Sequence, residues 1–126
     1  MFDWQPEYSV GFDEIDTLHR RVFQTAGELH AAIVAARAQD TLAQLLAAVV
    51  SCTRAHFTAE ETLMHSSQYP ESARHTAKHE AMRDRLLALQ DTRPTVETMQ
   101  SLKGALIQHI DDEDRELGRY LCGTAP

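Results

Sequence analysis

Six residues towards the end of the chain, HIDDED at 109–114, combine one histidine with four carboxylates. Histidine and carboxylate side chains are common ligands of transition metals. On a regular α-helix, an acid that shares a face with His109 lies three or four residues further on, which favours Asp112 or Glu113. Asp114 lies five residues further on, about 140° around the helix, so spacing alone argues against it.

Two further pairs of potential ligands have the spacing of one helical turn. His56 and Glu60 are four residues apart, and so are His75 and His79. Residues four apart lie on the same face of an α-helix, one turn from each other. A single pair of this kind often arises by chance, so either pair alone is a weak indication of a metal site.

The segments that carry these residues have the apolar spacing of α-helices and are separated by short turns. The predicted helices span residues 16–37, 41–65, 70–90 and 94–121. Short connections make successive helices antiparallel, so the sequence predicts an all-α, up-down-up-down four-helix bundle with an N-terminal extended arm. At this length we expect residues 1–126 to form a single domain.

Residues that favour helix starts accompany each predicted helix. We expect Asp16 to cap the first helix, and Thr41, with Gln44 three residues later, to form a capping box for the second. Pro70 and Pro94 suit the first positions of the third and fourth helices.

The turns place the two pairs of potential ligands at one height in the bundle. Glu60 and His56 precede the second predicted turn, residues 66–69, by six and ten residues. His75 and His79 follow the same turn by six and ten residues. Because each residue of an α-helix rises about 1.5 Å, the two pairs lie side by side on antiparallel helices.

Counting from the other two turns brings His19 and His109 to the same height. Five histidines and one glutamate from all four helices therefore share one layer, near the end of the bundle where the second turn lies. Burying five histidines without partners would be costly, so we interpret the layer as a metal site. Imidazole with carboxylate suits iron, zinc or copper better than magnesium or calcium. The number of ligands predicts two metal ions, with Glu60 bridging them.

Three residues with reactive side chains fall outside this site. His30 lies three turns from His19, and we expect a polar or core-edge role for it. His65 lies at a helix end, out of phase with His56, and we expect it to be exposed and to favour the helix dipole. Cys52, one turn before His56, is expected to be a small buried core residue.

Four segments resemble, in order, the motifs of bacterial hemerythrins. They are SVGFDEIDTLHRRVF, HFTAEETLM, YPESARHTAKHEAM and LKGALIQHIDDEDRELGRYL. The resemblance implies two iron ions joined by an oxo or hydroxo bridge, and reversible binding of O₂. By position it implies that one iron is held by His75, His79 and His109, the other by His19 and His56, and both by Glu60 and Asp114. The iron with two histidines would keep an open position for O₂.

The resemblance selects Asp114 rather than Asp112 or Glu113. A carboxylate that bridges two ions is displaced sideways from the ion that His109 holds, which would suit an acid that is out of phase with the histidine. We expect the other acids of HIDDED to be solvated or paired with Arg115 and Arg119.

The family's O₂ pocket corresponds to Phe57, Leu106 and Ile110 in this chain. Four residues before the last ligand histidine the family often has tryptophan, whereas this chain has Ala105. We expect the smaller side chain to enlarge the pocket or to open a path from solvent, and thereby to speed both O₂ entry and autoxidation.

Composition narrows the classes of partner. A formal net charge of −7 argues against nucleic acid and against an anionic membrane. No apolar run approaches the roughly 18 residues of a membrane span. With no visible secretory signal and no disulfide framework, a cytoplasmic location is expected.

The function that the resemblance implies is O₂ storage, delivery or sensing, without catalysis and with no protein partner indicated. One alternative is a di-iron oxidoreductase acting on peroxide, nitric oxide or ferrous iron (a ferroxidase). Another is repair of iron–sulfur clusters, and a third is a metal-free or zinc-bound interaction module.

Overall fold

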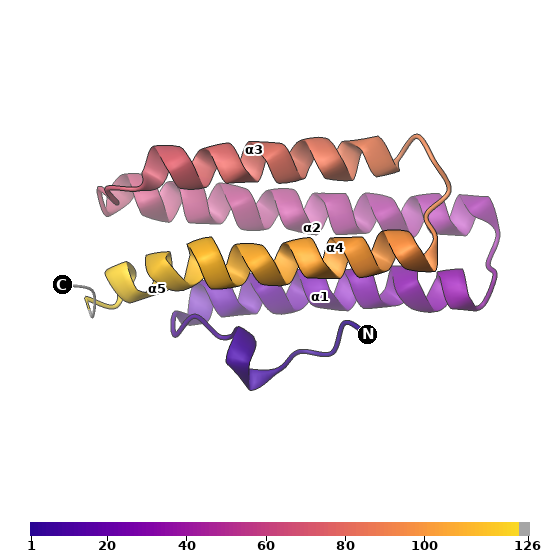
Figure 1. The fold of residues 1–126 in the computed structure, drawn as a ribbon, viewed down its shortest axis with the longest axis horizontal. Coiled ribbons are helices and arrows are strands. Elements are labelled where there is room, and N and C mark those ends of the chain that lie inside the picture. Colours follow the sequence, from indigo (N-terminus) through magenta and orange to yellow (C-terminus); the bar gives the residue numbers. More distant parts are fainter. Residues whose placement is uncertain (124–126) are drawn as a thin grey trace.

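Four long helices lie side by side in the computed structural model, which describes residues 1–123 (Figure 1). The helices are α1 (Asp13–Val34), α2 (Gln39–Ser66), α3 (Ser72–Leu89) and α4 (Val96–His109). A five-residue π-helical segment, η2 (Ile110–Asp114), joins α4 to α5 (Arg115–Leu121), and η1 (Pro6–Tyr8) is a 3₁₀ turn near the N-terminus. The last three residues of the predicted domain lie outside the described residues.

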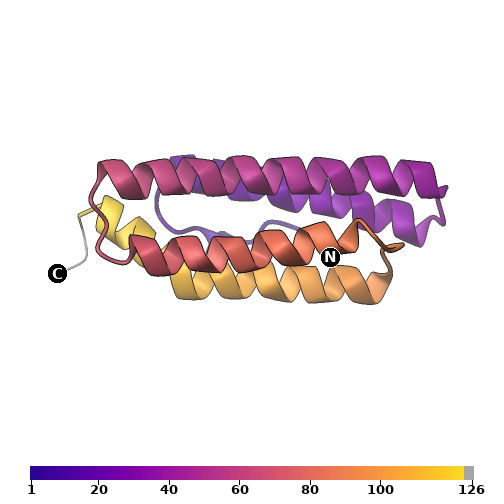
Figure 2. The same ribbon diagram turned by 90° about the horizontal axis from the view of Figure 1, so that it is seen from above.

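Successive long helices are antiparallel, and the two views show them arranged two by two (Figures 1 and 2). The α2–α3 turn lies at one end of the bundle, and the other two turns lie at the opposite end. The hydroxyl of Tyr120 on α5 donates a hydrogen bond of 2.7 Å to the carbonyl of Ser67, which fixes α5 beside the α2–α3 turn. The predicted up-down-up-down four-helix bundle is therefore confirmed.

Apolar side chains fill the space between the helices. On the predicted face of α1, Val22, Ala26 and Leu29 are buried, whereas Leu18 and Ile33 are half-buried. Burying a Leu, Phe or Val side chain stabilises the fold by roughly 1.5–3 kcal/mol relative to leaving it exposed. Such residues on both sides of the histidine layer hold the helices in place and offset the cost of burying polar groups there.

The predicted role of Asp16 as a helix cap is wrong. Helix α1 begins at Asp13, and no side chain caps it. The carboxylate of Asp16, inside the first turn, accepts hydrogen bonds from the backbone N–H of Val10 at 2.9 Å and from the hydroxyl of Ser9 at 2.5 Å. The acid therefore satisfies donors of the N-terminal arm rather than donors of the helix.

The capping box predicted at Thr41 is also absent, because α2 begins two residues earlier and has no side-chain cap. A capping box occurs instead at the start of α4, where Thr95 and Thr98 exchange two hydrogen bonds of 3.2 Å. It has threonine in place of the usual glutamate or glutamine, so the pattern did not reveal it. Pro70 and Pro94 lie in the turns just before α3 and α4 rather than inside these helices.

Residues 1–12 form the predicted arm, which runs alongside α1 in Figure 1. Its Trp4 ring lies 6.4 Å from the ring of His19, centroid to centroid. Arg115 on α5 donates hydrogen bonds of 2.8 and 2.9 Å to two carbonyls of the arm. The arm is therefore held over the side of the bundle that contains His19.

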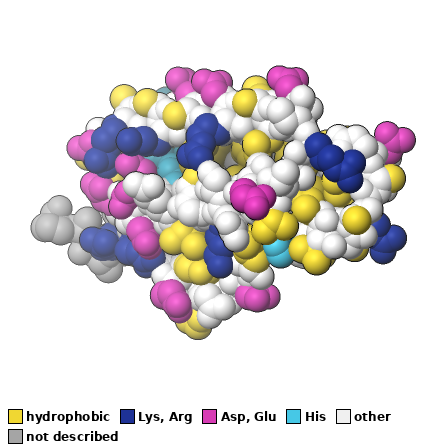
Figure 3. All heavy atoms as spheres, turned by 45° about the vertical axis from the view of Figure 1, so that its right-hand side comes forward, with side chains coloured by type: hydrophobic (Ala, Val, Ile, Leu, Met, Phe, Trp, Pro, Cys, Tyr) yellow, Lys and Arg dark blue, Asp and Glu magenta, His cyan; other side chains and the backbone are white. Residues whose placement is uncertain are grey.

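The outer surface mixes both signs of charge. On the face in Figure 3, acidic and basic side chains are interspersed among hydrophobic ones, and histidine appears over only small areas. Within residues 1–123, no helix combines the length and the apolar character needed to cross a membrane.

Candidate metal centre

The seven residues predicted as ligands come together in the interior of the bundle. They are His19 from α1, His56 and Glu60 from α2, His75 and His79 from α3, His109 from the end of α4, and Asp114 from η2. None of the seven is more than 7% exposed. The layer predicted from the distances to the turns therefore exists as one buried cluster.

The potential donor atoms form two groups, and within each group the atoms lie within 4.8 Å of one another. The three-histidine group contains His75, His79 and His109. The two-histidine group contains His19 and His56. Glu60 and Asp114 belong to both groups.

Glu60 divides its two carboxylate oxygens between the groups. Its Oε1 lies 2.9 Å from Nε2 of His75 and 3.0 Å from Nε2 of His79. Its Oε2 contacts Nε2 of His56 and lies 3.4 Å from Nε2 of His19. A carboxylate that bridges two cations needs this arrangement.

Asp114 is divided in the same way. Its Oδ1 lies 2.9 Å from Nε2 of His75 and 3.1 Å from Nε2 of His109. Its Oδ2 lies 2.9 Å from Nε2 of His19 and 3.9 Å from Nε2 of His56. Two buried carboxylates thus span the same pair of positions.

The π-helical segment explains how Asp114 reaches the cluster. The backbone N–H of Arg115 donates to the carbonyl of Ile110, five residues earlier. A hydrogen bond of that span widens the turn, so residue i+5 comes round close to residue i. His109 and Asp114 therefore share a face, which they would not do on a regular α-helix. A local change of helix type, rather than the sideways position expected of a bridging ligand, therefore accounts for the offset between His109 and Asp114.

Glu113, the rival from regular helical spacing, belongs to neither group. It is buried, and its Oε2 lies 3.4 Å from a guanidinium nitrogen of Arg74 on α3. The expectation that it is solvated is wrong. Asp111 and Asp112 are exposed, and Asp111 pairs with Arg115 at 2.9 Å.

Several donor atoms of the cluster have no hydrogen-bond partner among the described residues. They include both ring nitrogens of His19, Nε2 of His109 and both oxygens of Asp114. His19 Nε2 and Asp114 Oδ2 are close enough for a hydrogen bond, but their geometry is not that of one. Buried polar atoms without partners are costly, whereas lone pairs that converge on a common point suit a bound cation. The residues present therefore fit a site for two metal ions.

The two carboxylates keep their negative charge in this interior. Burial raises the pKa of Glu60, but the neighbouring histidines, His56 first, outweigh burial and hold that pKa well below its usual value. Burial and the charge of Glu60 raise the pKa of Asp114, but His109 and His19 lower it by more, so its pKa is also lowered. Two anionic bridging candidates are thus available to cations.

Protons occupy part of the cluster when no metal is bound. Burial lowers the pKa of His19 and of His75, but the nearby carboxylates of Asp114 and Glu60 raise both values to about 9. At His56 burial outweighs Glu60, and the pKa is lowered. A cation must displace the protons of His19 and His75 when it binds, so metal binding and pH are linked.

A small cavity of about 10 Å³ adjoins the two-histidine group. Its apolar lining consists of Val22, Phe23, Phe57, Met82, Leu106 and Ile110, and its polar lining of His19, His56, His109 and Asp114. That volume is roughly enough for one water-sized molecule. The site therefore offers a small, mostly apolar space beside its less crowded group of ligands.

Three of the four residues predicted for the ligand pocket line this cavity: Phe57, Leu106 and Ile110. Three other lining residues, Val22, Phe23 and Met82, were not predicted, although their spacing indicates them. Val22 and Phe23 follow His19 by three and four residues, and Met82 follows His79 by three. Residues at these separations lie on the same helix face as the ligand.

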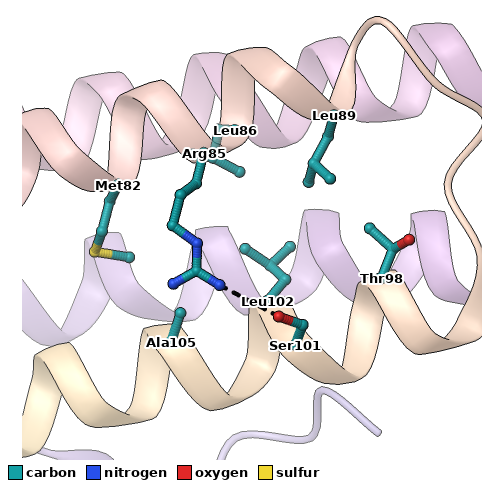
Figure 4. Close-up of a pocket in the computed structure, with 8 residues that line it drawn as sticks. All are labelled: Met82, Arg85, Leu86, Leu89, Thr98, Ser101, Leu102 and Ala105. Atoms are coloured by element: carbon teal, nitrogen blue, oxygen red, sulfur yellow. Dashed lines mark hydrogen bonds between the residues drawn. The ribbon is translucent and has the colours of Figure 1, made fainter.

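Ala105, the fourth predicted pocket residue, lies outside this cavity. It lines a groove of about 270 Å³ between α3 and α4, and an adjoining hollow of about 220 Å³. Figure 4 shows the groove, with a guanidinium nitrogen of Arg85 donating a 3.2 Å hydrogen bond to Ser101 across it. Met82 lines the groove and the cavity, so its side chain stands between them.

His65, His30 and Cys52 belong to neither group of donor atoms. His65 is exposed in the last turn of α2, as expected. The ring of His30 is half-buried and packs 6.3 Å from the ring of Phe2, centroid to centroid, at the core edge. Cys52 is half-buried rather than buried.

Comparison with known proteins points to one family. Residues 10–121 match the hemerythrin HHE cation binding domain. The chain is 32% identical over 119 residues to a bacteriohemerythrin of Stenotrophomonas maltophilia (strain R551-3), covering 89% of this chain and 76% of that protein. It is 32% identical over 77 residues to a bacteriohemerythrin of Pseudomonas aeruginosa (strain UCBPP-PA14), covering 61% of this chain and only 50% of the relative.

Solved structures show the same fold. A crystal structure of wild-type hemerythrin matches with a TM-score of 0.89 at 23% sequence identity, covering 98% of each chain. A crystal structure of a single-residue hemerythrin mutant matches with the same TM-score at 22% identity.

Proposed function

This chain belongs to the hemerythrin family, and we propose that its buried cluster holds two iron ions and binds O₂ reversibly. The family match and the buried histidine–carboxylate cluster show a hemerythrin-like cation-binding protein. The finer proposal concerns which metal is held, which residues hold it and what it binds.

One observation carries the proposal: both carboxylates are shared, but the histidines are divided unequally. The three-histidine group has five potential ligand residues, and the two-histidine group has four. An iron held by His19, His56, Glu60 and Asp114 would therefore have one more coordination position without a protein ligand than an iron held by the three-histidine group. The small cavity lies on that side of the cluster.

The residues around the cavity suit a small neutral ligand. Phe57, Leu106 and Ile110 give it an apolar wall, which disfavours ions and additional water. The iron pair, when bound, would supply the electrons for reversible O₂ binding. The chain's own part is to orient the ligands, to restrict the space beside them and to keep it dry.

The same lining favours binding over catalysis. Within the described part of the chain, the only acidic or basic side chains that line the cavity are His19, His56, His109 and Asp114, all of them proposed ligands. No separate general acid or base stands beside the space where a substrate would react. We therefore propose O₂ storage, delivery or sensing rather than a di-iron oxidoreductase or repair of iron–sulfur clusters.

Iron analysis combined with absorption spectroscopy tests the proposal. The purified protein is expected to contain two irons per chain. Adding O₂ to the reduced form should produce a visible band that disappears when O₂ is removed. Irreversible oxidation with turnover would favour the oxidoreductase, and a protein that takes up no iron would overturn the proposal.

A further inference from the structure

Four residues form a contact between α2 and α3 around His79, which we name the His79 clasp. Phe57 and Glu61 come from α2, and His79 and Arg83 come from α3. Within each helix the two residues are four apart, so both pairs lie on the facing sides of neighbouring helices. Glu61 and Arg83 have no place in the ligand set proposed above.

The hydrogen bond between His79 and Glu61 determines which ring nitrogen carries the proton. Nδ1 of His79 lies 2.8 Å from Oε2 of Glu61. A carboxylate only accepts hydrogen bonds, so Nδ1 is the donor. In the neutral imidazole, the form that binds a metal, Nε2 then keeps its lone pair, and it lies 3.0 Å from Oε1 of Glu60 inside the cluster. Glu61 thus fixes the tautomer that a metal ligand needs.

Three of the other four histidines of the cluster lack such a contact. Nδ1 of His19, of His56 and of His75 is buried and has no hydrogen-bond partner in the part of the chain described. His79 is thus distinguished from them by a carboxylate on its outer nitrogen.

The rest of the clasp holds the ring and balances the charge. The ring of Phe57 stacks on the ring of His79, with centroids 4.0 Å apart and an angle of 17° between the planes. A guanidinium nitrogen of Arg83 lies 2.8 Å from the same oxygen of Glu61 that His79 contacts. The guanidinium carbon of Arg83 also lies 5.4 Å from the centroid of the Phe57 ring. Glu61 and Arg83 are 29% and 28% exposed, so solvent reaches the outer edge of the clasp.

We infer that Glu61 is a positioning residue for the metal centre and that Arg83 moderates its effect. The inference rests on the proposed function, since it requires His79 to bind a metal ion. The carboxylate of Glu61 draws on the Nδ1 proton and makes the imidazole a stronger electron donor to the metal. Arg83 shares that carboxylate and weakens the effect.

The two charges should act in opposite directions on the reduction potential of bound iron. Replacing Glu61 by glutamine removes a negative charge that favours the oxidised metal, so the potential rises. Replacing Arg83 by methionine removes the balancing positive charge, so the potential falls. If the contact were merely structural, both substitutions would loosen His79, and both would shift the reduction potential in the same direction.

Two readouts test the inference, and the first needs no iron. In zinc-loaded protein, Glu61→Leu is expected to speed zinc release to a chelator by about 10–100-fold. Glu61→Gln keeps an acceptor for the Nδ1 proton, so its zinc release should stay much closer to that of the natural protein. In iron-loaded protein, potentiometric titration should show opposite shifts for Glu61→Gln and Arg83→Met.

The matched control is Glu116→Gln, which changes the net charge equally. Glu116 is 48% exposed and pairs with Arg74 at 3.1 Å, so this variant should leave zinc release and the potential unchanged. Unchanged zinc release in Glu61→Leu, or shifts of the same sign in the two charge variants, would overturn the inference. If circular dichroism shows that the Glu61 variants do not fold, the test rests on Arg83→Met. An unchanged or raised reduction potential in that variant would overturn the inference.

Failure of the inference can be told apart from failure of the proposed function. Zinc release that depends on Glu61 would support the clasp even if iron failed to bind O₂ reversibly. If the protein holds two irons and binds O₂ reversibly, but zinc release does not depend on Glu61, the proposed function is supported and the inference is overturned. A natural protein that takes up neither metal overturns both.

Discussion

Glu60 and Asp114 each present one carboxylate oxygen to the three-histidine group and the other to the two-histidine group. One of the two acids comes from a regular helix and the other from a π-helical segment. Because both span the same two positions, removing either one should disturb both proposed metal sites.

Asp114 and Glu113 should differ sharply when each is replaced by alanine. Asp114→Ala removes a buried carboxylate that contacts both groups, and we expect it to lose most of its bound iron. Glu113→Ala removes a contact with Arg74 outside the cluster, so iron should be largely retained. The number of iron ions per chain is measured in both variants by mass spectrometry of the folded protein. Equal loss in both variants would contradict the assignment of Asp114.

Ala105→Trp should lengthen the lifetime of the oxygenated protein. The indole would fill the groove between α3 and α4 and restrict Met82, which separates the groove from the cavity. Water and protons should then reach the site more slowly, and autoxidation, followed by absorption spectroscopy, should slow. Val34→Trp is the control, since Val34 is 65% exposed and lines neither the groove, the adjoining hollow nor the cavity. An unchanged or shorter lifetime in Ala105→Trp would argue against this path.

The metal-free protein should lose stability as the pH rises from about 6.5 to about 9. Folding raises the pKa of His19 and of His75 from 6.5 to about 9. Their contribution is therefore fully present below pH 6.5 and is lost as the pH rises through 9. The pKa values of Glu60, Asp114 and His56 are lowered from their ordinary values, so these groups change stability only at pH values below this window.

Thermal unfolding across that pH range provides the measurement. The midpoint of the metal-free protein should fall by several degrees. The metal-loaded protein is the control, because bound cations replace the protons of His19 and His75, and its midpoint should change much less. A metal-free midpoint that stays constant or rises would contradict the raised pKa values.

Gly118→Ala should detach the N-terminal arm. A Cβ atom at Gly118 would lie 2.3 Å from the backbone oxygen of Val10, so the arm or α5 would have to move. We expect a loss of stability of about 1–3 kcal/mol, as for overpacked cores. The fluorescence of Trp4, the only tryptophan of the chain, should also change, because Trp4 belongs to the arm.

Gly104→Ala is the matched control for that prediction. A Cβ atom at Gly104 on α4 meets no atom within 4 Å. Alanine is the better helix former, so this variant should be more stable by roughly 0.5–1 kcal/mol, with unchanged fluorescence. Urea unfolding of both variants measures the difference, and an equal effect at the two positions would refute the close approach of Val10.

The helical bundle and the height of the ligand layer could be predicted from the amino-acid sequence without the structure. His56, Glu60, His75 and His79 could be placed at one level because an α-helix has a constant rise and the turn between the two helices is short. The apolar face of α1 could be predicted for the same reason. These features depend on the spacing of residues that are close together in the sequence.

Helical spacing alone does not favour Asp114 over Glu113, and the packing of the helices explains why Asp114 reaches the cluster. Regular spacing favoured Glu113, but the π-helical segment brings Asp114 under His109 and leaves Glu113 beside Arg74. The choice of helix type depends on which packing satisfies both acids at once. Asp114 contacts His19 on α1 and His75 on α3, and Glu113 contacts Arg74 on α3. A local sequence pattern does not contain these contacts between helices.

The outer contacts of the site were also decided by packing between helices. Glu61 stands next to Glu60 in the sequence, yet its partner is His79, 18 residues later on α3. Ala105 lines the groove rather than the cavity, and Met82, on another helix, lines both. Spacing along one helix indicates which face a residue occupies, but what lies opposite that face depends on how the helices pack together.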